Sequence, residues 1–139
     1  MPGPRQYPSR PFLGVGALIF EGEKILLVER GKEPLKGYWS LPGGILETGE
    51  TLRDGTRREV FEETGYELRR VKRLYSYHPT NGTSDKEFHI LHGQAGRQTG
   101  SIDPHEVEAL RWVTRQELRQ MLKSHKIRDG LTLSALLFI

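Results

Sequence analysis

Hydrophobic residues in the first third of the chain fall into short runs that polar and turn-forming residues separate. Residues 13–20 and 24–28 are apolar, and the tripeptide Glu-Gly-Glu at 21–23 joins them, so this segment predicts a β-hairpin. A further short strand is expected at residues 38–41. The tripeptide Pro-Gly-Gly at 42–44 follows it and predicts a loop without regular structure.

The segment after this loop has the composition of a helix. Asp54 follows Thr51 by three residues, which resembles an N-terminal capping arrangement, and Gly65 is placed to end the helix. The sequence therefore predicts a helix over residues 51–64. Gly55 lies inside it, where a glycine costs up to about 1 kcal/mol of stability.

More strands are expected in the second half of the chain. Residues 66–77 and 87–95 are typical of extended structure and flank a turn-rich loop at 79–85. A further strand is expected at residues 107–113. These strands and the N-terminal hairpin together predict a β-sheet.

Two helices complete the expected fold. Thr114 and Glu117 have the spacing of a capping box, and the helix that they open has Leu118, Met121 and Leu122 on one face. Residues 131–138 suggest a final apolar helix. The whole pattern predicts a mixed β-sheet with helices packed on its faces, which is an α/β/α sandwich of the α+β class.

The chain is long enough for one ordinary domain and too short for two, because it has 139 residues. We expect an N-terminal arm over residues 1–11 and one domain over residues 12–139. The arm lacks the apolar stretch of a signal peptide, and no run approaches the 18 or so apolar residues that span a membrane. We therefore expect a cytoplasmic protein with no membrane partner. The absence of cysteine excludes disulfides, thiolate zinc sites and cysteine nucleophiles, so any metal must be held by oxygen or imidazole.

The net charge is mildly basic at +3. The densest basic run consists of Arg69, Arg70, Lys72 and Arg73. It fits either a solvated strand edge or a patch that attracts phosphate. The sequence leaves both interpretations open.

One segment has a spacing that points to chemistry. From Gly44 to Tyr66 the sequence is GILETGETLRDGTRREVFEETGY, which fits G-x5-E-x7-R-E-U-x-E-E-x-G-U, with U an apolar or aromatic residue. Chance agreement in one window is on the order of one in 10⁸. On a helix Glu59 lies three residues before Glu62 and four before Glu63, so these carboxylates share a face.

Like charges at this spacing repel by about 0.2–0.5 kcal/mol per pair. A divalent cation between the carboxylates would offset that cost, and Mg²⁺ prefers such hard oxygen ligands. A solvated glutamate-rich helix is the alternative for the short stretch 59–62 alone. The full spacing makes the cation site the better interpretation.

The pattern resembles the Nudix box, and residues 37–44 resemble the segment that usually precedes it. The resemblance implies a Nudix-type α/β/α sandwich and a hydrolase that cuts the pyrophosphate of nucleoside diphosphates linked to another group. It implies Mg²⁺ as the cofactor, with Mn²⁺ as a substitute. Glu59 and Glu63 match direct metal ligands, Glu62 a third or bridging ligand, and the backbone carbonyl of Gly44 a ligand from the loop.

Further residues match positions that catalysis needs in the family. Arg58 matches the residue that orients the carboxylates by ion pairing, and Glu50 lies where the loop enters the helix and could bind a water next to the metal. Glu106, in the segment before Trp112, matches the general base or an extra ligand. Glu108 is the alternative, and a plain surface pair is the third interpretation. The five histidines show no convincing metal-ligand spacing.

Segments outside the box bear on the substrate. Residues 75–85 and 126–132 resemble the ADP-ribose pyrophosphatase subgroup, which implies hydrolysis of ADP-ribose or a related nucleoside diphosphate sugar to a nucleoside monophosphate and a sugar phosphate. Tyr75 and Tyr77 share a strand face and could stack on a base or belong to the core. Arg30 could contact a phosphate or face solvent.

The expected partner is a small-molecule nucleotide, and a homodimer stays open. A nucleic acid partner is not expected. Three other functions stay possible: an enzyme that removes oxidised nucleoside triphosphates, an RNA-end pyrophosphohydrolase and a non-catalytic nucleotide-binding module. The last would be expected to lose carboxylates of the box, and this sequence keeps them.

Overall fold

The structure of the chain is a computed structural model that describes residues 12–139. The arm predicted over residues 1–11 lies outside the described residues. The elements in chain order are β1 (Leu13–Glu21), β2 (Lys24–Arg30), β3 (Trp39–Ser40), β4 (Gly43–Ile45), α1 (Leu52–Thr64), β5 (Tyr66–Tyr77), β6 (Glu87–Gln98), β7 (Val107–Val113), α2 (Arg115–Lys123), α3 (Gly130–Ala135) and the 3-10 turn η1 (Leu136–Phe138).

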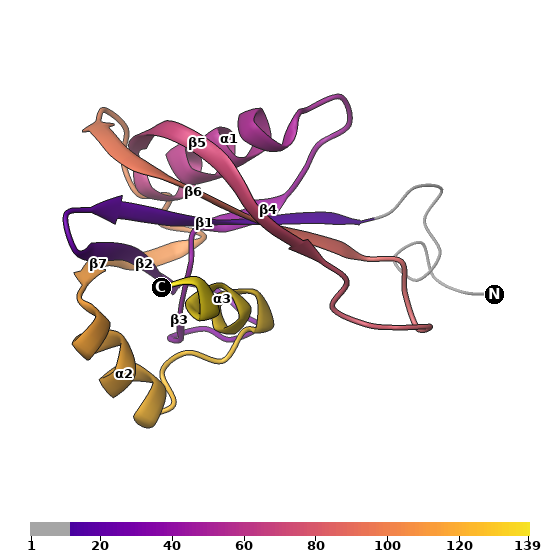
Figure 1. Ribbon diagram of the computed structural model, residues 1–139. Helices are drawn as coiled ribbons and strands as arrows, with labels where there is room; N and C mark the ends of the chain where they lie inside the picture. The colour runs from indigo at the N-terminus through magenta and orange to yellow at the C-terminus, as the bar shows by residue number, and fades with distance from the viewer. Residues whose placement is uncertain (1–11) are drawn as a thin grey trace.

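The strands form one mixed sheet, as the sequence predicts (Figure 1). Its main path runs β3-β2-β1-β6-β5, with β4 paired to β1 and β7 paired to β2. β1 and β6 are parallel, and the other pairs are antiparallel. The β1–β2 hairpin is confirmed, and Gly22 in its turn has a φ of 62°, a left-handed conformation that glycine adopts without strain. β5 is an edge strand.

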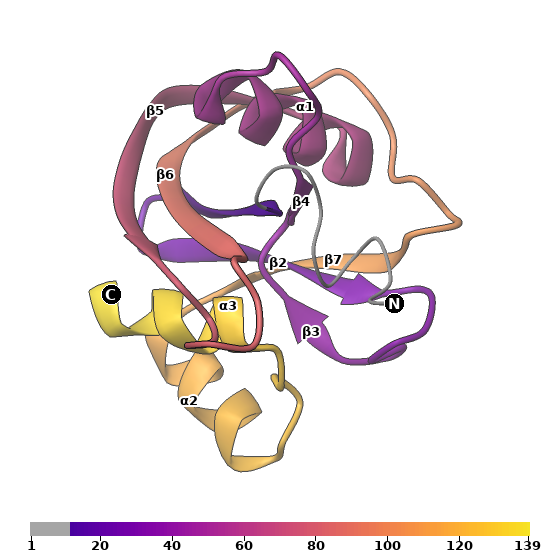
Figure 2. The same cartoon turned by 90° about the vertical axis from the view of Figure 1, so that its right-hand side faces the viewer.

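Helices cover both faces of the sheet, which confirms the α/β/α sandwich. α1 lies on one face, and α2 and α3 lie on the other (Figure 2). The side chains of β1 alternate between the two faces because successive residues of a strand point in opposite directions. Val15 and Ala17 belong to the cluster that contains Val60 of α1, whereas Leu18 belongs to the cluster that contains Met121 of α2.

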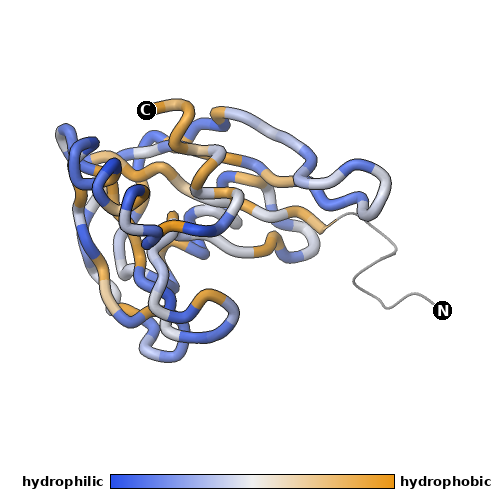
Figure 3. The backbone as a smooth tube through the Cα atoms, turned by 90° about the horizontal axis from the view of Figure 1, so that it is seen from below, coloured by the Kyte–Doolittle hydropathy of each residue, from blue (hydrophilic) through white to orange (hydrophobic). Residues whose placement is uncertain are grey.

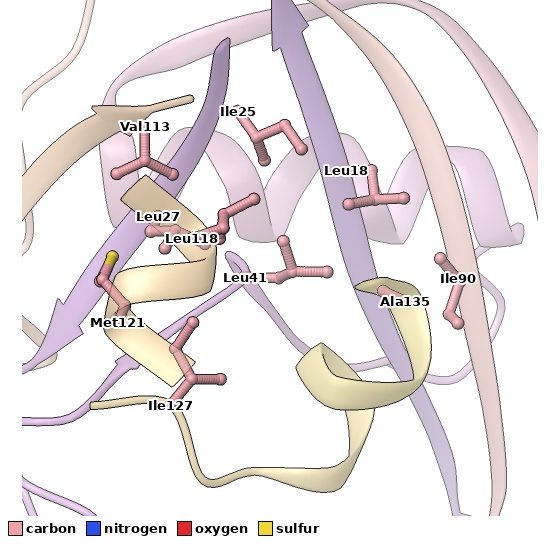
Figure 4. Close-up of a cluster of buried hydrophobic side chains, with 10 residues drawn as sticks. All are labelled: Leu18, Ile25, Leu27, Leu41, Ile90, Val113, Leu118, Met121, Ile127 and Ala135. Atoms are coloured by element: carbon pink, nitrogen blue, oxygen red, sulfur yellow. The ribbon is translucent and has the colours of Figure 1, made fainter. Parts of the chain in front are cut away.

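The core on the α2 and α3 side gathers residues from distant parts of the chain. Figure 4 shows side chains of β1 and β2 meeting those of α2 and α3. The buried members of this cluster are Leu18, Ile25, Leu27, Leu41, Ile90, Val113, Leu118, Met121, Ile127 and Ala135. In Figure 3 the hydrophobic segments include the strands at the centre and the C-terminal end of the chain. None of the helices between residues 12 and 139 is long and apolar enough to cross a bilayer.

The expectation of an irregular loop at residues 42–44 is wrong. Gly43 and Gly44 belong to β4, which pairs with β1 through Gly16 and Val15. The reason is steric and tertiary: a Cβ at Gly43 would overlap the Val15 carbonyl oxygen, so the missing side chain is what lets the two backbones approach. Local propensity alone does not report such a pairing.

The helix boundaries follow the capping signals. Thr51 accepts a hydrogen bond from the Asp54 N–H, and Gly65 ends α1 in a left-handed conformation with a φ of 76°. Thr114 and Glu117 form the predicted capping box of α2. The final helix differs from the prediction, because α3 ends at Ala135 and a 3-10 turn follows it.

Gly55 has a packing reason in the structure. A Cβ at this position would overlap the Leu46 side chain and lie 3.1 Å from Glu50 Oε1. The loop that precedes α1 therefore occupies the space that an alanine would need. The glycine allows this loop to pack directly on the helix.

Candidate active site

One face of α1 meets the glycine strand β4. Val60 and Thr56 are buried, which fixes the rotation of the helix and directs Glu59 toward the loop side. A Cβ at Gly44 would overlap the Glu59 carboxylate, so Glu59 lies directly against the Gly44 backbone. The backbone N–H of Gly43 donates a hydrogen bond to the carboxylate of Glu63. The structure thus brings together Gly44, Glu59 and Glu63, as the sequence predicts.

Ionisation of the two helix carboxylates, Glu59 and Glu63, is unfavourable because both are partly buried. Burial, and after it the nearby Glu59 charge, raise the pKa of Glu63 to about 8, although the hydrogen bond from the Gly43 N–H lowers it. Burial also raises the pKa of Glu59, against the stabilising effect of Arg58. Such a pair favours whatever supplies positive charge at this position, whether a proton or a cation.

Arg58 organises the acidic side chains around it. Its Nε and Nη2 donate to both carboxylate oxygens of Glu50 at 2.7 and 2.9 Å, a bidentate pair. Its Nη1 donates to Glu59 at 3.0 Å and to Glu62 at 3.2 Å, and its Nη2 also reaches the Ile45 carbonyl at 3.1 Å. The guanidinium therefore ties the loop before α1 to the helix and holds Glu59 in place.

Glu50 and Glu62 differ from Glu59 in their exposure and in their hydrogen-bond partners. Glu50 accepts the Glu47 N–H at 2.8 Å in addition to the Arg58 pair, so its carboxylate is engaged within the protein. The Glu62 side chain is 56% exposed and pairs with Arg58. The assignments of Glu62 as a bridging metal ligand and of Glu50 as the holder of a water stay predictions.

We expect the Glu50–Arg58 pair to make stability depend on acid pH. Hydrogen bonds from Arg58 and from the Glu47 N–H lower the pKa of Glu50 from 4.5 to about 2. Because the folded pKa is depressed, the stabilisation is complete above pH 4.5 and is lost as the pH falls toward 2. Thermal unfolding between pH 2 and pH 7 should show a smaller decline below pH 4.5 in Glu50→Gln than in the wild type. Glu23→Gln, in the exposed β1–β2 turn, is the control, and an unchanged slope in Glu50→Gln would contradict the assignment.

Glu106 lies in the loop directly before β7, far from α1 in the sequence, and approaches the same site. The Gly31 N–H donates to the Glu106 carbonyl at 2.8 Å, which fastens its loop to the end of β2. The charge of Glu106 contributes to the raised pKa of both Glu59 and Glu63, so the three carboxylates share one region. Lys32 Nζ lies 2.6 Å from Glu106 Oε1.

The alternative residue, Glu108, is exposed on β7, and it is not among the groups that shift the pKa of Glu59 or Glu63. This geometry supports Glu106 over Glu108 for the role of base or additional ligand.

A cavity of about 420 Å³ opens beside the acidic site. Gly43 and Gly44 line it at the α1 side, and Arg30 also lines it. The guanidinium of Arg30 donates to the Pro34 carbonyl at 2.8 Å and its charge acts on Glu63, which places a cation beside the carboxylates. The remaining lining residues are Phe12, Gly14, Val15, Pro34, Leu35, Ser40, Leu41, Ile45, Lys86, Phe88, Asp129, Gly130 and Leu131.

The predicted substrate tyrosines lie elsewhere on the same side of the sheet. Neither Tyr75 nor Tyr77 is among the residues that line this cavity. Tyr75 packs on Phe138 with ring centroids 5.3 Å apart, and Tyr77 packs edge-on against Phe88 at 5.8 Å. Tyr77 therefore supports Phe88, which does line the cavity. A base-stacking role for either tyrosine stays a prediction.

Three residues that line the cavity or contact Glu106 were not predicted from the sequence as site residues. Lys32 pairs with Glu106, Phe88 lines the cavity, and Asp129 lines it while capping α3. Only Asp129 has a local signal, because it stands three residues before Thr132, whose N–H it accepts. The positions of Lys32 and Phe88 depend on the pairing of distant segments.

The donor set fits a magnesium ion that shares its ligands with a substrate. Within residues 12–139 no three acidic or histidine side chains are close enough to hold a metal ion by themselves. The carboxylates of Glu59 and Glu63 remain as two hard oxygen donors next to the Gly44 backbone. Mg²⁺ usually binds proteins through one or two carboxylates and completes its shell with waters and substrate phosphates, so this set suits it.

The fold and the site together define a class. The protein is an α/β/α sandwich in which an acidic helix face meets a Gly-Gly strand beside a cavity. This arrangement brings two carboxylates, a glycine backbone and an arginine to one place, which suits a divalent cation and a phosphate-bearing ligand.

Comparisons with known proteins identify the family. The NUDIX domain family model matches residues 10–135. The ADP-ribose pyrophosphatase of Methanocaldococcus jannaschii is 37% identical over 81 residues, which are 58% of this chain and 47% of that protein. A Bacillus subtilis protein that carries 8-oxo-dGTP diphosphatase as a provisional name is 32% identical over 97 residues, 70% of this chain and 62% of that protein. The chain matches less than two thirds of the length of either relative.

A solved structure agrees with the sequence match. The NUDIX hydrolase from Nitrosomonas europaea has a TM-score of 0.77 at 26% identity, covering 91% of this chain and 86% of that one. The chain belongs to the Nudix hydrolase family. The two relatives differ in their named substrates, so the family does not by itself define what this chain hydrolyses.

Proposed function

We propose that the chain is a Mg²⁺-dependent pyrophosphohydrolase that cleaves ADP-ribose or a related nucleoside diphosphate sugar. The products are a nucleoside monophosphate and a sugar phosphate. The observation that carries the proposal is the junction of Glu59 and Glu63 with the cavity at Gly43 and Gly44. A diphosphate at this junction would have a ribose or base directed into the cavity.

The residues divide the work of hydrolysis. Glu59 and Glu63 would hold the cation, which would neutralise phosphate charge and activate a water when bound. Glu106 accepts a proton from the attacking water. At the same time the water oxygen bonds to phosphorus and the bridging P–O bond breaks. Arg30 binds the phosphate through its guanidinium, and Arg58 keeps Glu59 oriented. The bond electrons leave with the departing phosphate.

Residues of the cavity favour a nucleoside or sugar part of moderate polarity. Phe88 and Leu131 offer apolar surface. The Oδ1 atom of Asp129 is buried and has no hydrogen-bond partner within the described residues. A buried acceptor without a partner costs about 1–3 kcal/mol, so a ribose hydroxyl or a base amino group could supply the missing donor if Asp129 shifts to expose this oxygen.

A substrate panel tests the proposal. We expect kcat/KM with Mg²⁺ to be highest for ADP-ribose or a nucleoside diphosphate hexose, and lower for a dinucleoside polyphosphate and for 8-oxo-dGTP. The physical reason is that the cavity beside the cation site would hold a ribose or sugar. Product identification should find a nucleoside monophosphate and a sugar phosphate.

The competing activity has a distinct result. An enzyme acting on oxidised nucleoside triphosphates releases pyrophosphate, and the similarity to the Bacillus subtilis protein makes this the second candidate. If 8-oxo-dGTP exceeds ADP-ribose by more than about tenfold in kcat/KM, equivalent to about 1.4 kcal/mol in transition-state binding, the ADP-ribose assignment is wrong. The proposed cation site and the proposed reaction class would not be affected by that result.

A further inference from the structure

A second, strongly basic cavity lies between α1 and the β5–β6 edge of the sheet. Its volume is about 770 Å³. Arg53 and Arg57 reach it from α1, and Arg70 and Lys72 reach it from β5. Figure 2 shows α1 lying over β5 and β6, so segments far apart in the sequence converge here. The basic run that the sequence singled out thus becomes part of a concave site.

This basic cavity is separate from the acidic site. None of its lining residues lines the cavity next to Gly44. With 3.6 residues per helical turn, Glu59 lies roughly 200° around α1 from Arg57, so the helix presents its carboxylates and these arginines to different sides. An anion bound between Arg53, Arg57 and Arg70 would therefore not occupy the catalytic position.

The positive charges of the cavity are largely uncompensated. No acidic residue lines it. In the part of the chain that the structure describes, the side chains of Arg53, Arg70 and Lys72 make no hydrogen bond or ion pair. Arg57 reaches only Asp54, at 4.0 Å, and the Leu68 carbonyl, at 3.4 Å. Protein surfaces ordinarily intersperse the two signs of charge, and like charges gathered in a concavity focus the field on an anion.

The backbone at Arg70 is unusual. Arg70 has a φ of 54°, in the left-handed region that non-glycine residues rarely adopt, and the pairing of β5 with β6 shifts register between Arg69 and Lys72. Such bulges redirect side chains and recur beside functional sites. Here the irregularity falls on a residue whose side chain lines the cavity.

We propose that this cavity is a second anion site, which binds a compact polyphosphate such as inorganic tripolyphosphate or the phosphate chain of a nucleoside polyphosphate. Three arginines offer planar donor forks that match phosphate oxygens, and Lys72 adds a point charge. Phe20 and His92 are the two residues of the lining with aromatic rings, and both are half-buried. A single-stranded nucleic acid would use several exposed aromatic rings for its bases, so the lining favours the compact anion.

Isothermal titration with inorganic tripolyphosphate tests the site. EDTA removes divalent cations and so prevents cation-dependent binding at Glu59 and Glu63. The α1 pair Arg53→Gln with Arg57→Gln and the β5 pair Arg70→Gln with Lys72→Gln each remove two charges of the cavity from a different element. The matched control, Arg69→Gln with Arg73→Gln, removes two charges from the same strand outside the cavity. Thermal unfolding shows whether each variant is folded.

We expect each cavity pair to weaken the Kd at least about tenfold and the control pair to change it by less than about twofold. Equal weakening by the control would overturn the proposal, since it would show a response to net charge alone. A wild-type Kd weaker than about 1 mM at about 150 mM salt would also overturn it.

Two further outcomes identify other sites. Loss of binding in Arg30→Gln but not in the cavity pairs would place the anion in the substrate cavity and overturn the proposal. A short single-stranded RNA that binds through the same arginines more than about tenfold more tightly would make the surface a nucleic acid site, which also overturns it. Failure of the proposed hydrolase activity would leave this binding measurement unaffected, so the two proposals stand or fall separately.

Discussion

Glu59→Gln should lower kcat with Mg²⁺ by at least about 100-fold, the scale of a lost metal contact or catalytic group. The amide has nearly the same shape as the carboxylate but no charge, so it leaves Glu63 as the one anionic donor beside Gly44. Glu63→Gln should have a comparable effect, because its carboxylate is the other half of the pair. Steady-state kinetics over a range of Mg²⁺ concentrations measure the loss.

A stability measurement separates chemistry from folding. Both substitutions replace a carboxyl that burial makes costly to ionise, so the metal-free variants should unfold at the same temperature as the wild type or higher at neutral pH. Glu23→Gln makes the same chemical change on an exposed turn and should keep full activity. Near-normal turnover in Glu59→Gln or Glu63→Gln would refute the assignment of these carboxylates.

The second large effect is expected at Glu106. Glu106→Gln should depress kcat far more than it changes KM, because a base or extra ligand acts in the transition state and contributes about 10²–10⁴ in rate. Its electrostatic influence on Glu59 and Glu63 and its anchored loop indicate that it lies near the helix carboxylates. Steady-state kinetics with saturating Mg²⁺ separate the two parameters.

Two neighbours serve as controls for Glu106. Glu108→Gln should leave kcat nearly unchanged, since Glu108 is exposed on β7. Lys32→Gln breaks the 2.6 Å pair with Glu106 and should lower kcat less than Glu106→Gln does, because the carboxylate itself remains. If Glu108→Gln is inactive while Glu106→Gln is active, the two residues exchange roles.

Local sequence signals were sufficient for most elements. The α1 caps at Thr51 and Gly65 and the α2 capping box at Thr114 are short-range hydrogen-bond patterns, and the structure confirms them. The apolar runs at residues 13–20 and 24–28 predicted the β1–β2 hairpin, which the structure also confirms. These features depend on interactions between residues that are close in the sequence, so the sequence alone is enough to predict them.

Long-range pairing was not predictable in the same way. β4 forms because Gly43 and Gly44 meet β1, and no local preference of a Pro-Gly-Gly segment indicates that contact. The same limit applies to α3, where Leu136 to Phe138 tighten into a 3-10 turn at the end of the helix. A close backbone approach depends on what the partner strand offers, and the partner is distant in sequence.

The sequence by itself determined the acidic helix face, its loop and the family resemblance, because helical spacing alone puts Glu59 and Glu63 on one side of α1. Only the tertiary structure decided what meets that face. It brought Glu106 near the helix carboxylates and placed Phe88 rather than Tyr75 in the cavity lining. It also brought Arg53 of α1 and Arg70 of β5 into the lining of one basic cavity. The physical reason is that these encounters follow from sheet register and helix packing, which the whole core fixes together.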